Sequence, residues 1–265
     1  MCSSDLEEVQ SLVSNGCKEV TLLGQNINSY GKGLSGNVTL GDLLTELNEI
    51  DGLERIRFVT SHPADMSRDL IRTMSRLEKV CEYLHMPAQS GSDEVLKRMR
   101  RGYTADYYRE FVRYARELIP HLTVASDFIV GFPGETEEDF QETVRLMEDI
   151  RFQNCFIFKY SPRTGTKAAE LKDDVPDETK RARNLKLLEL QKKISLEENT
   201  KMIGKKVDVL VEGASKSDLN RLSGRTRQNH IVVFNGSQEF VGKLVVVLIH
   251  EVTDLTLFVK LTSCL

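Results

Sequence analysis

The sequence lacks several patterns that mark common classes of protein. It has no apolar run long enough to span a bilayer, so a membrane-spanning helix is excluded. Its five cysteines are scattered, with no CxxC or CxxxCxxC spacing, which argues against a metal-binding knuckle and a disulfide framework. We therefore expect reduced, buried thiols in a cytoplasmic protein. The cysteines are Cys2, Cys17, Cys81, Cys155 and Cys264.

The chain also lacks a Walker loop, a GxSxG elbow and a GxGxxG dinucleotide turn. The net charge of -4 is unevenly distributed. From Lys201 onward, nine Lys and Arg face six Asp and Glu, whereas the preceding part is acidic. A basic tail on an acidic body favours contact between the tail and a polyanion.

What the sequence does contain is a repeated strand-then-helix pattern. Five apolar runs, each followed by a helical pattern, end on polar residues or glycine. Right-handed connections between such units would give a parallel sheet that curls into an open barrel, an α/β fold. An incomplete barrel would leave unpaired strand edges at Glu19 and Cys155. The expected strands are 19–24, 55–60, 83–86, 122–130 and 155–160.

After a long helix over 177–198, the apolar period changes from 3.6 to two. Short strands from Gly204 onward, separated by glycines, predict a small antiparallel β-barrel of about 65 residues. We place the domain boundary near Asn199, giving a core of residues 1–198 and a barrel of residues 199–265.

The stretch from Ser126 to Thr136 is the most distinctive of the chain. An apolar strand breaks at Gly131-Phe-Pro-Gly and continues into an acidic helix start. The glycines permit a ligand to approach the backbone, and Asp127 is a carboxylate inside an apolar strand. A tight turn with a satisfied buried Asp127 is the alternative.

The predicted strand ends bring unlike polar groups to one rim. Together these groups predict a cleft for a polar ligand with hydroxyls, an amine and a carboxylate. At each single position, a satisfied loop side chain remains the alternative. The groups are Gln25 and Asn26, Ser61 and His62, Gln89 and Ser90, Ser126 and Asp127 with Glu135, and Arg163.

Two basic regions stand out. Residues 97–103 form a basic run with an aromatic, a pattern typical of a solvated helix end. The basic residues of the predicted barrel favour RNA binding, with a merely solubilising surface as the alternative. The RNA-binding candidates are Lys205, Lys206, Arg221, Arg225 and Arg227.

Five blocks of the sequence, in this order, resemble those of the MiaB-type tRNA methylthiotransferases. These are radical S-adenosylmethionine (SAM) enzymes, and the likeness covers nearly the whole chain from Glu7. It implies a radical SAM core, of which this chain has the second to sixth of six βα units, and a TRAM domain, a small RNA-binding barrel. The blocks are 22–30, 60–63, 84–92, 126–135 and 223–226.

The resemblance also implies roles for individual residues. Gly24, Gln25 and Asn26 would hold the amino group of SAM. Ser126, Asp127 and Ile129 would contact its ribose and adenine. Arg163 would lie on the rim of the cofactor site. From the polar strand ends, we add Ser61 and Gln89 to the expected cofactor-binding residues. We assign no catalytic residue and no metal ligand in this chain.

The chain departs from the family in lacking its N-terminal domain and the CxxxCxxC loop. In the family, cysteines of both regions hold two 4Fe-4S clusters, and none of the five cysteines here stands at a matching position. We therefore expect a fragment that is inactive alone.

The full-length family replaces C2–H of an isopentenylated adenosine, beside the tRNA anticodon, with a methylthio group. Two alternatives stay open. One is a methylthiotransferase acting on a ribosomal protein, against which Gly24-Gln25-Asn26 argues. The other is a non-catalytic RNA-binding remnant.

Overall fold

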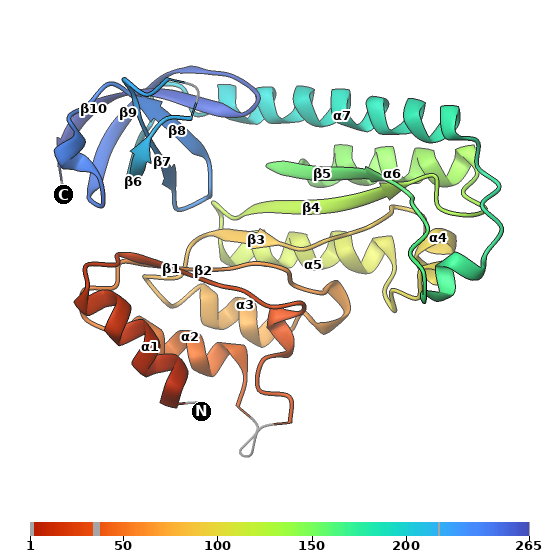
Figure 1. Ribbon diagram of the computed structural model, residues 1–265, viewed down its shortest axis with the longest axis horizontal. Coiled ribbons are helices and arrows are strands. Elements are labelled where there is room, and N and C mark those ends of the chain that lie inside the picture. The colour runs from red at the N-terminus through yellow and green to blue at the C-terminus, as the bar shows by residue number, and fades with distance from the viewer. Residues whose placement is uncertain (1–2, 34–37, 217, 265) are drawn as a thin grey trace.

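The computed structural model describes residues 3–33, 38–216 and 218–264 (Figure 1). Five parallel strands build the first domain, as the sequence predicted. They form two ladders, β1–β2 and β3–β4–β5, linked by an isolated parallel bridge between Ile56 and Val80. The strands are β1 (Glu19–Leu22), β2 (Arg55–Phe58), β3 (Tyr83–His85), β4 (Thr123–Val130) and β5 (Asn154–Lys159).

Six helices accompany these strands, and polar caps define where most of them begin. Thr39 and Thr136 each form a capping box, while Ser67, Ser92 and Thr104 each accept a hydrogen bond from a backbone N–H of the first turn. Apolar side chains of the helices and of the outer strand face form one core. The helices are α1 (Ser3–Ser14), α2 (Leu40–Asn48), α3 (Arg68–Met74), α4 (Asp93–Arg98), α5 (Ala105–Leu118) and α6 (Glu137–Ile150).

The long helix α7 (Asp177–Thr200) covers the edge strand β5 with polar side chains. Asn184 donates to the carbonyl of Ile157, and Gln191 donates to that of Phe152. Among the described residues, β1 pairs with β2 alone and β5 with β4 alone, so the strand edges expected at Glu19 and Cys155 lack a further strand, and α7 places two amide hydrogen bonds at the second of them. The periodicity of α7 indicated a helix but could not show which backbone groups its amides would meet.

Five strands close the C-terminal barrel in the order β10-β8-β7-β6-β9. Four of the pairings are antiparallel, but β8 and β10 run parallel, which corrects the prediction of a wholly antiparallel barrel. Strands that alternate in direction cannot close a ring of odd number, so one pair must be parallel. The strands are β6 (Lys206–Ala214), β7 (Leu222–Thr226), β8 (Ile231–Phe234), β9 (Leu244–Val252) and β10 (Thr256–Cys264).

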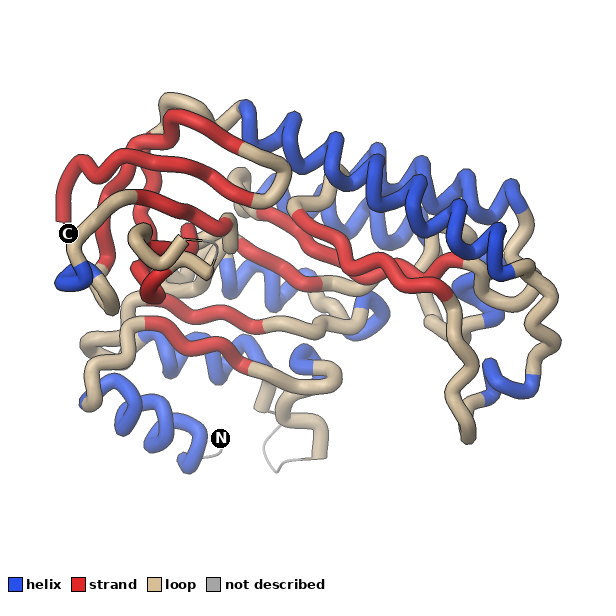
Figure 2. Tube along the Cα trace, turned by 45° about the horizontal axis from the view of Figure 1, so that its top comes forward, coloured by secondary structure: helices blue, strands red, loops and turns tan. Residues whose placement is uncertain are grey.

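The barrel is attached at the end of the core where the core strands begin (Figures 1 and 2). Arg55 and Arg57 of β2 donate to backbone carbonyls at the end of β7, and Thr123 of β4 donates to the carbonyl of Gln228. The segments that follow the core strands, including α4, lie at the opposite end. Within the described residues, no helix is both long and apolar enough to span a membrane.

Candidate functional site

A cleft of about 710 Å³ lies at the end of the core where β3, β4 and β5 finish. It brings together four of the predicted cofactor residues, Gln89, Asp127, Ile129 and Arg163. The remaining lining comes from the end of α4 and the segment after it, from the turn after β4, and from the end of β5 and the segment after it. Those further residues are Arg98, Met99, Arg100, Arg101, Phe132, Phe158, Lys159, Tyr160, Ser161, Thr166, Lys167 and Ala168.

The period of β4 separates the predicted residues Ser126 and Asp127. Asp127 and Ile129 are partly exposed and line the cleft, whereas Ser126 is wholly buried. The Ser126 hydroxyl accepts a hydrogen bond from the N–H of Ala88 at 2.8 Å, which holds the segment that follows β3. Ser126 therefore lies outside the lining of the cleft.

Gln89 continues β3 and takes a left-handed backbone conformation, with φ of 65°. Its N–H donates to the carbonyl of Asp127, and its carbonyl accepts from the N–H of Ile129. Thr60, just after β2, is also left-handed, with φ of 68°. Such strain in residues other than glycine gathers at functional sites, and here it lies where the strands end.

Ser61 is the clearest unfilled polar position near this rim. Its N–H donates to the carbonyl of His85, but its buried hydroxyl oxygen has no partner among the described residues. A buried hydroxyl without a partner is unusual and indicates room for a polar ligand atom. The neighbouring His62 has a pKa lowered by burial and by the charge of Arg101.

The predicted segment Gly24-Gln25-Asn26 follows β1 and lies outside the lining of the cleft. The Asn26 amide donates to the Asp65 carboxylate at 2.5 Å and to the Ser29 hydroxyl at 2.8 Å. Lys32 and Asn26 lower the pKa of Asp65. Asn26 thus joins the loops after β1 and β2, and this contact was not foreseen from the sequence.

Glu135, expected at the rim, instead ties the glycine turn to α7. Its carboxylate accepts from the N–H of Gly131 at 2.5 Å and from Arg183 at 2.8 Å, and burial raises its pKa. A Cβ at Gly131 would lie 2.2 Å from the side chain of Lys180. For Glu135 and Gly131, the alternative given for this stretch, a tight structural turn, therefore applies.

The candidate RNA residues lie in different surroundings on the barrel. Lys205 and Lys206 line a groove of about 860 Å³ between the barrel and the core. Arg221 is half-exposed, 3.4 Å from Asp218 and 6.0 Å from the centre of the Phe258 ring. Arg225 pairs with Glu212 at 3.2 Å.

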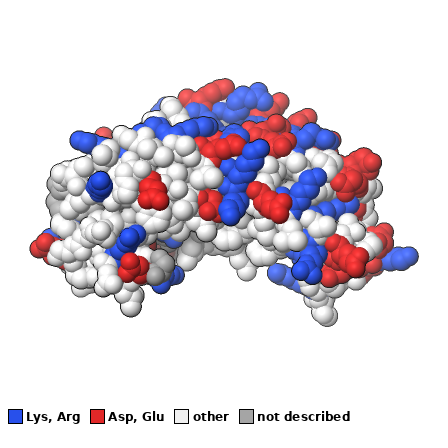
Figure 3. Space-filling model, turned by 90° about the horizontal axis from the view of Figure 1, so that it is seen from above, with Lys and Arg blue, Asp and Glu red and all other residues white. Residues whose placement is uncertain are grey.

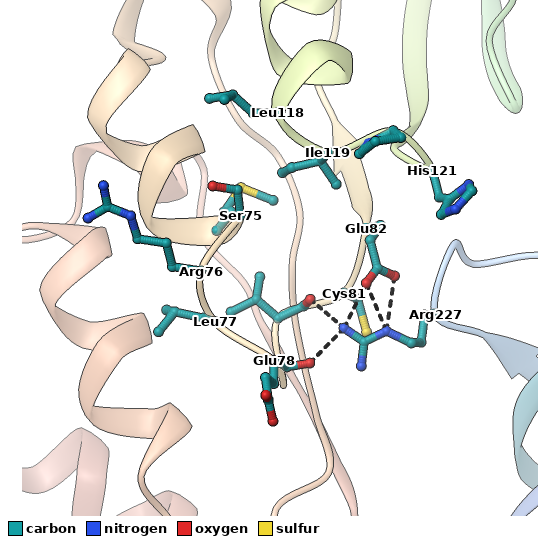
Figure 4. Close-up of a pocket in the computed structure, with 13 residues that line it drawn as sticks. Ser75, Arg76, Leu77, Glu78, Cys81, Glu82, Leu118, Ile119, His121 and Arg227 are labelled. Carbon is teal, nitrogen blue, oxygen red and sulfur yellow. Dashed lines mark hydrogen bonds and ion pairs between the residues drawn. The ribbon is translucent and has the colours of Figure 1, made fainter.

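Arg227 faces the core rather than solvent (Figure 4). It pairs with the Glu82 carboxylate at 2.9 Å and donates to the carbonyls of Glu78 and Val80. Gln228 reinforces this contact by donating to Glu82. Arg227 thus has a docking role that the sequence did not indicate.

Charge is mixed on the face that carries α7 (Figure 3). Lys and Arg alternate there with Asp and Glu. The surface of the C-terminal barrel, at the left of this view, carries few charged residues. The cleft is different, since six of its sixteen lining residues are Lys or Arg and Asp127 is its one carboxylate. The basic character of the cleft therefore belongs to its lining and not to the whole surface.

Comparison with known proteins decides the family. The profile of the radical SAM superfamily matches residues 4–147, just over half of the chain. The chain belongs to the radical SAM superfamily. The profile of the TRAM domain matches residues 200–262, which covers the C-terminal barrel. The fold predicted from the sequence, a partial radical SAM barrel followed by a TRAM domain, is thereby confirmed.

Several similar proteins carry the name tRNA-2-methylthio-N(6)-dimethylallyladenosine synthase. The protein of Carboxydothermus hydrogenoformans is 52% identical over 93% of this radical SAM chain and 56% of its own length. The protein of Moorella thermoacetica is 49% identical over 91% of this chain and 54% of its own length. The protein of Clostridium botulinum strain Loch Maree is 47% identical over 95% of this chain and 56% of its own length. The predicted MiaB-type family is confirmed, and the chain spans about half the length of these relatives.

A solved structure supports the fold alone. The coproporphyrinogen III oxidase of Escherichia coli, described as a radical SAM enzyme, superposes with a TM-score of 0.52 at 15% identity. The superposition covers 83% of this chain and 58% of the oxidase.

Proposed function

We propose that this chain supplies the SAM-binding and RNA-binding parts of a cytoplasmic tRNA methylthiotransferase. The complete enzyme would replace C2–H of an isopentenylated adenosine beside the anticodon with a methylthio group. The observation that carries this proposal is the 52% identity to a relative of that name across 93% of the chain. The names of the relatives favour tRNA over a ribosomal protein as the substrate.

The cleft fits SAM in its chemistry. Asp127 offers a carboxylate for ribose hydroxyls, Arg163 matches a carboxylate, and Ile129 offers an apolar surface for adenine. The unpartnered Ser61 hydroxyl and the Gln89 side chain supply further polar groups beside it. When bound, SAM supplies the radical chemistry that removes hydrogen from the substrate. The role of the chain is to bind and orient it.

Iron-sulfur clusters do not fit the described residues. A cubane cluster needs several Cys thiolates, and the described residues contain no group of three His, Cys, Asp or Glu that could hold a metal ion. Burial raises the pKa of Cys81 to about 11 and that of Cys155 well above its usual range. Both thiols are thus protonated and packed in the fold, and no step of the reaction runs through them.

The barrel would hold RNA through Lys205, Lys206 and Arg221. Lys205 and Lys206 line the large groove, and Arg221 lies over the face of Phe258. Cations next to a partly exposed ring are typical of surfaces that bind phosphates and stack bases. Arg225 and Arg227 stay RNA candidates on one condition. To bind either arginine, an RNA phosphate must displace its present partner, which is Glu212 for Arg225 and Glu82 for Arg227.

Two measurements test this proposal. Calorimetric titration of the 265-residue chain with SAM should show binding, and tRNA should bind with an affinity that falls linearly with log salt. Joining the N-terminal part of the C. hydrogenoformans synthase ahead of Glu7 should add methylthiolation of isopentenylated tRNA. The unextended chain, given SAM and a reductant, should form no 5′-deoxyadenosine.

Failure of each measurement has a distinct meaning. If the chain does not bind SAM, or does not bind tRNA, the proposal is overturned. If both bind but the joined protein stays inactive, the chain is an RNA-binding remnant and not half of an enzyme.

A further inference from the structure

The segment that closes helix α4 presents two adjacent arginines to the cleft. Met99 caps the helix, and Arg100 follows in a left-handed conformation with φ of 58°. The Arg100 N–H donates to the carbonyl of Lys97, and the Arg101 N–H donates to that of Leu96, both at 3.0 Å. This double hydrogen bond is the Schellman ending of a helix.

Arginine at this left-handed position destabilises the folded chain. Glycine is the usual residue there, because a side chain with a Cβ is strained at positive φ. The helix would end in the same way with glycine at position 100, so its geometry does not require arginine. An arginine at a strained position beside a cleft points to a role in binding.

The segment is also held firmly in place. The hydroxyl of the partly buried Tyr103 donates to the carbonyl of Ala88 at 2.9 Å, which ties the segment to the residues that follow β3. The Tyr103 ring meets His62 edge-on, with 5.8 Å between ring centres. The Nε of Arg101 is buried without a partner among the described residues. Arg100 and Arg101 therefore project from a fixed backbone.

Of the six basic residues that line the cleft, three form ion pairs with carboxylates and, among the described residues, three do not. Arg98 pairs with Asp139 at 3.2 Å, Lys159 with Asp177 at 3.1 Å and Lys167 with Glu170 at 3.4 Å. Within the described part of the chain, no carboxylate pairs with the remaining three, which are Arg100, Arg101 and Arg163.

We propose that Arg100 and Arg101 bind RNA phosphates next to the nucleotide that enters the cleft. This inference rests on the proposed function. SAM carries one carboxylate, for which Arg163 suffices, so two guanidinium groups remain for other anions. A guanidinium matches a phosphate with two parallel hydrogen bonds. The TRAM barrel lies at the opposite end of the core strands, so phosphates near the target need cations of their own at this rim.

The test uses the full 265-residue chain and a fluorescent anticodon stem-loop RNA. Binding is measured over a salt series for the unaltered chain, Arg100→Gly, Arg101→Gln and the double variant. Each substitution should weaken binding and reduce the log–log salt slope by about 0.9, the value for one lost phosphate contact on a helix, or by about 0.7 on a single strand. Arg113→Gln is the control, since Arg113 is an exposed arginine on α5, away from the lining of the cleft.

Arg100→Gly gives a second readout that a structural role would not produce. Relief of the left-handed strain should raise the melting temperature by about 2 °C while RNA binding falls. SAM affinity, measured by calorimetry, should stay unchanged in both single variants.

The possible failures are distinguishable. Unchanged RNA affinity and salt slope in the variants would overturn the phosphate role and leave the proposed function standing. Reduced SAM affinity with normal RNA binding would assign the two arginines to the cofactor and likewise overturn it. No RNA binding by the unaltered chain would overturn both proposals.

Discussion

The Nε2 atom of His85 lies 3.0 Å from Oδ1 of Asp127, within hydrogen-bonding distance. The two residues stand on neighbouring parallel strands, β3 and β4, and the His85 ring also meets Phe156 edge-on. The sequence left two interpretations of Asp127 open, a hydrogen-bonded structural carboxylate and a cofactor residue. The structure fits both, because Asp127 has a hydrogen-bond partner and also lines the cleft. His85 holds the carboxylate in place without burying it, since about a quarter of the Asp127 side chain stays exposed.

This arrangement predicts that Asp127 can be neutralised without loss of the fold. Asp127→Asn keeps an oxygen that can accept from His85, but it removes the charge that strengthens hydrogen bonds to ribose hydroxyls. We expect SAM affinity to fall about tenfold and the melting temperature to change by only a few degrees. Calorimetric titration and thermal unfolding measure the two effects.

Glu189→Gln serves as the control, because Glu189 is an exposed carboxylate on α7. A large drop in stability of Asp127→Asn with unchanged SAM affinity would make Asp127 a structural residue only.

Arg55 is predicted to hold the barrel against the core. Its buried side chain donates to the Asp208 carboxylate at 2.6 Å and to the carbonyls of Asp208 and Arg225. Arg55→Ala leaves these acceptors without a partner, and we expect a loss of about 3 kcal/mol in the free energy of unfolding. Arg227→Ala should also destabilise, by about 1–2 kcal/mol, because the carbonyls of Glu78 and Val80 lose this donor and Glu82 loses its ion pair, although Gln228 still donates to Glu82.

Arg221→Ala is the matched control, since an exposed ion pair contributes less than about 1 kcal/mol. It should weaken RNA binding without changing stability in urea. Equal stability of the three variants would show that these arginines do not dock the barrel.

Stability should fall in mild acid because of His230. Burial lowers the pKa of His230 to about 4, whereas the unfolded chain titrates near 6.5. The unfolded state therefore binds this proton first, so the contribution of His230 is complete above pH 6.5 and is lost as the pH falls towards 4. The loss approaches about 3 kcal/mol.

Urea unfolding at pH 7 and pH 4.5 measures this effect in the unaltered chain, in His230→Gln and in the exposed-residue control His250→Gln. Of the two variants, only His230→Gln should reduce the difference in the free energy of unfolding between pH 7 and pH 4.5. The same slope in all three would mean that carboxylates, and not His230, cause the acid sensitivity.

Helix α7 should depend on one buried amide where it covers β5. Gln191 donates to the Phe152 carbonyl at 2.9 Å and to the Ser195 hydroxyl at 2.8 Å. Gln191→Leu leaves a buried carbonyl unpaired, and we expect destabilisation by about 1–3 kcal/mol. Lys192→Leu, at the next and exposed position, should change stability by less than about 0.5 kcal/mol. Gln191→Leu as stable as Lys192→Leu would show that this bond does not anchor the helix.

Local pattern was enough to determine the elements and their order. The five strand runs, the caps at Thr39 and Thr136, and the change to period two after Gly204 all depend on neighbours in the sequence. Because parallel strands end at one edge, the rim position of Gln89, Asp127 and Arg163 followed from order alone. The motifs were specific enough to indicate the family.

Only the tertiary structure decided what each side chain meets. Ser126 and Asp127 are adjacent in sequence, yet the pleat sends one into the core and the other to the cleft. Arg227 was counted among the basic residues of the barrel, but Glu82, 145 positions away, holds it in the interface. From the sequence, the basic run with Arg100 and Arg101 was interpreted as a solvated helix end. In the structure, both residues line the cleft. Such contacts join residues that are distant along the chain, and no local period or propensity encodes them.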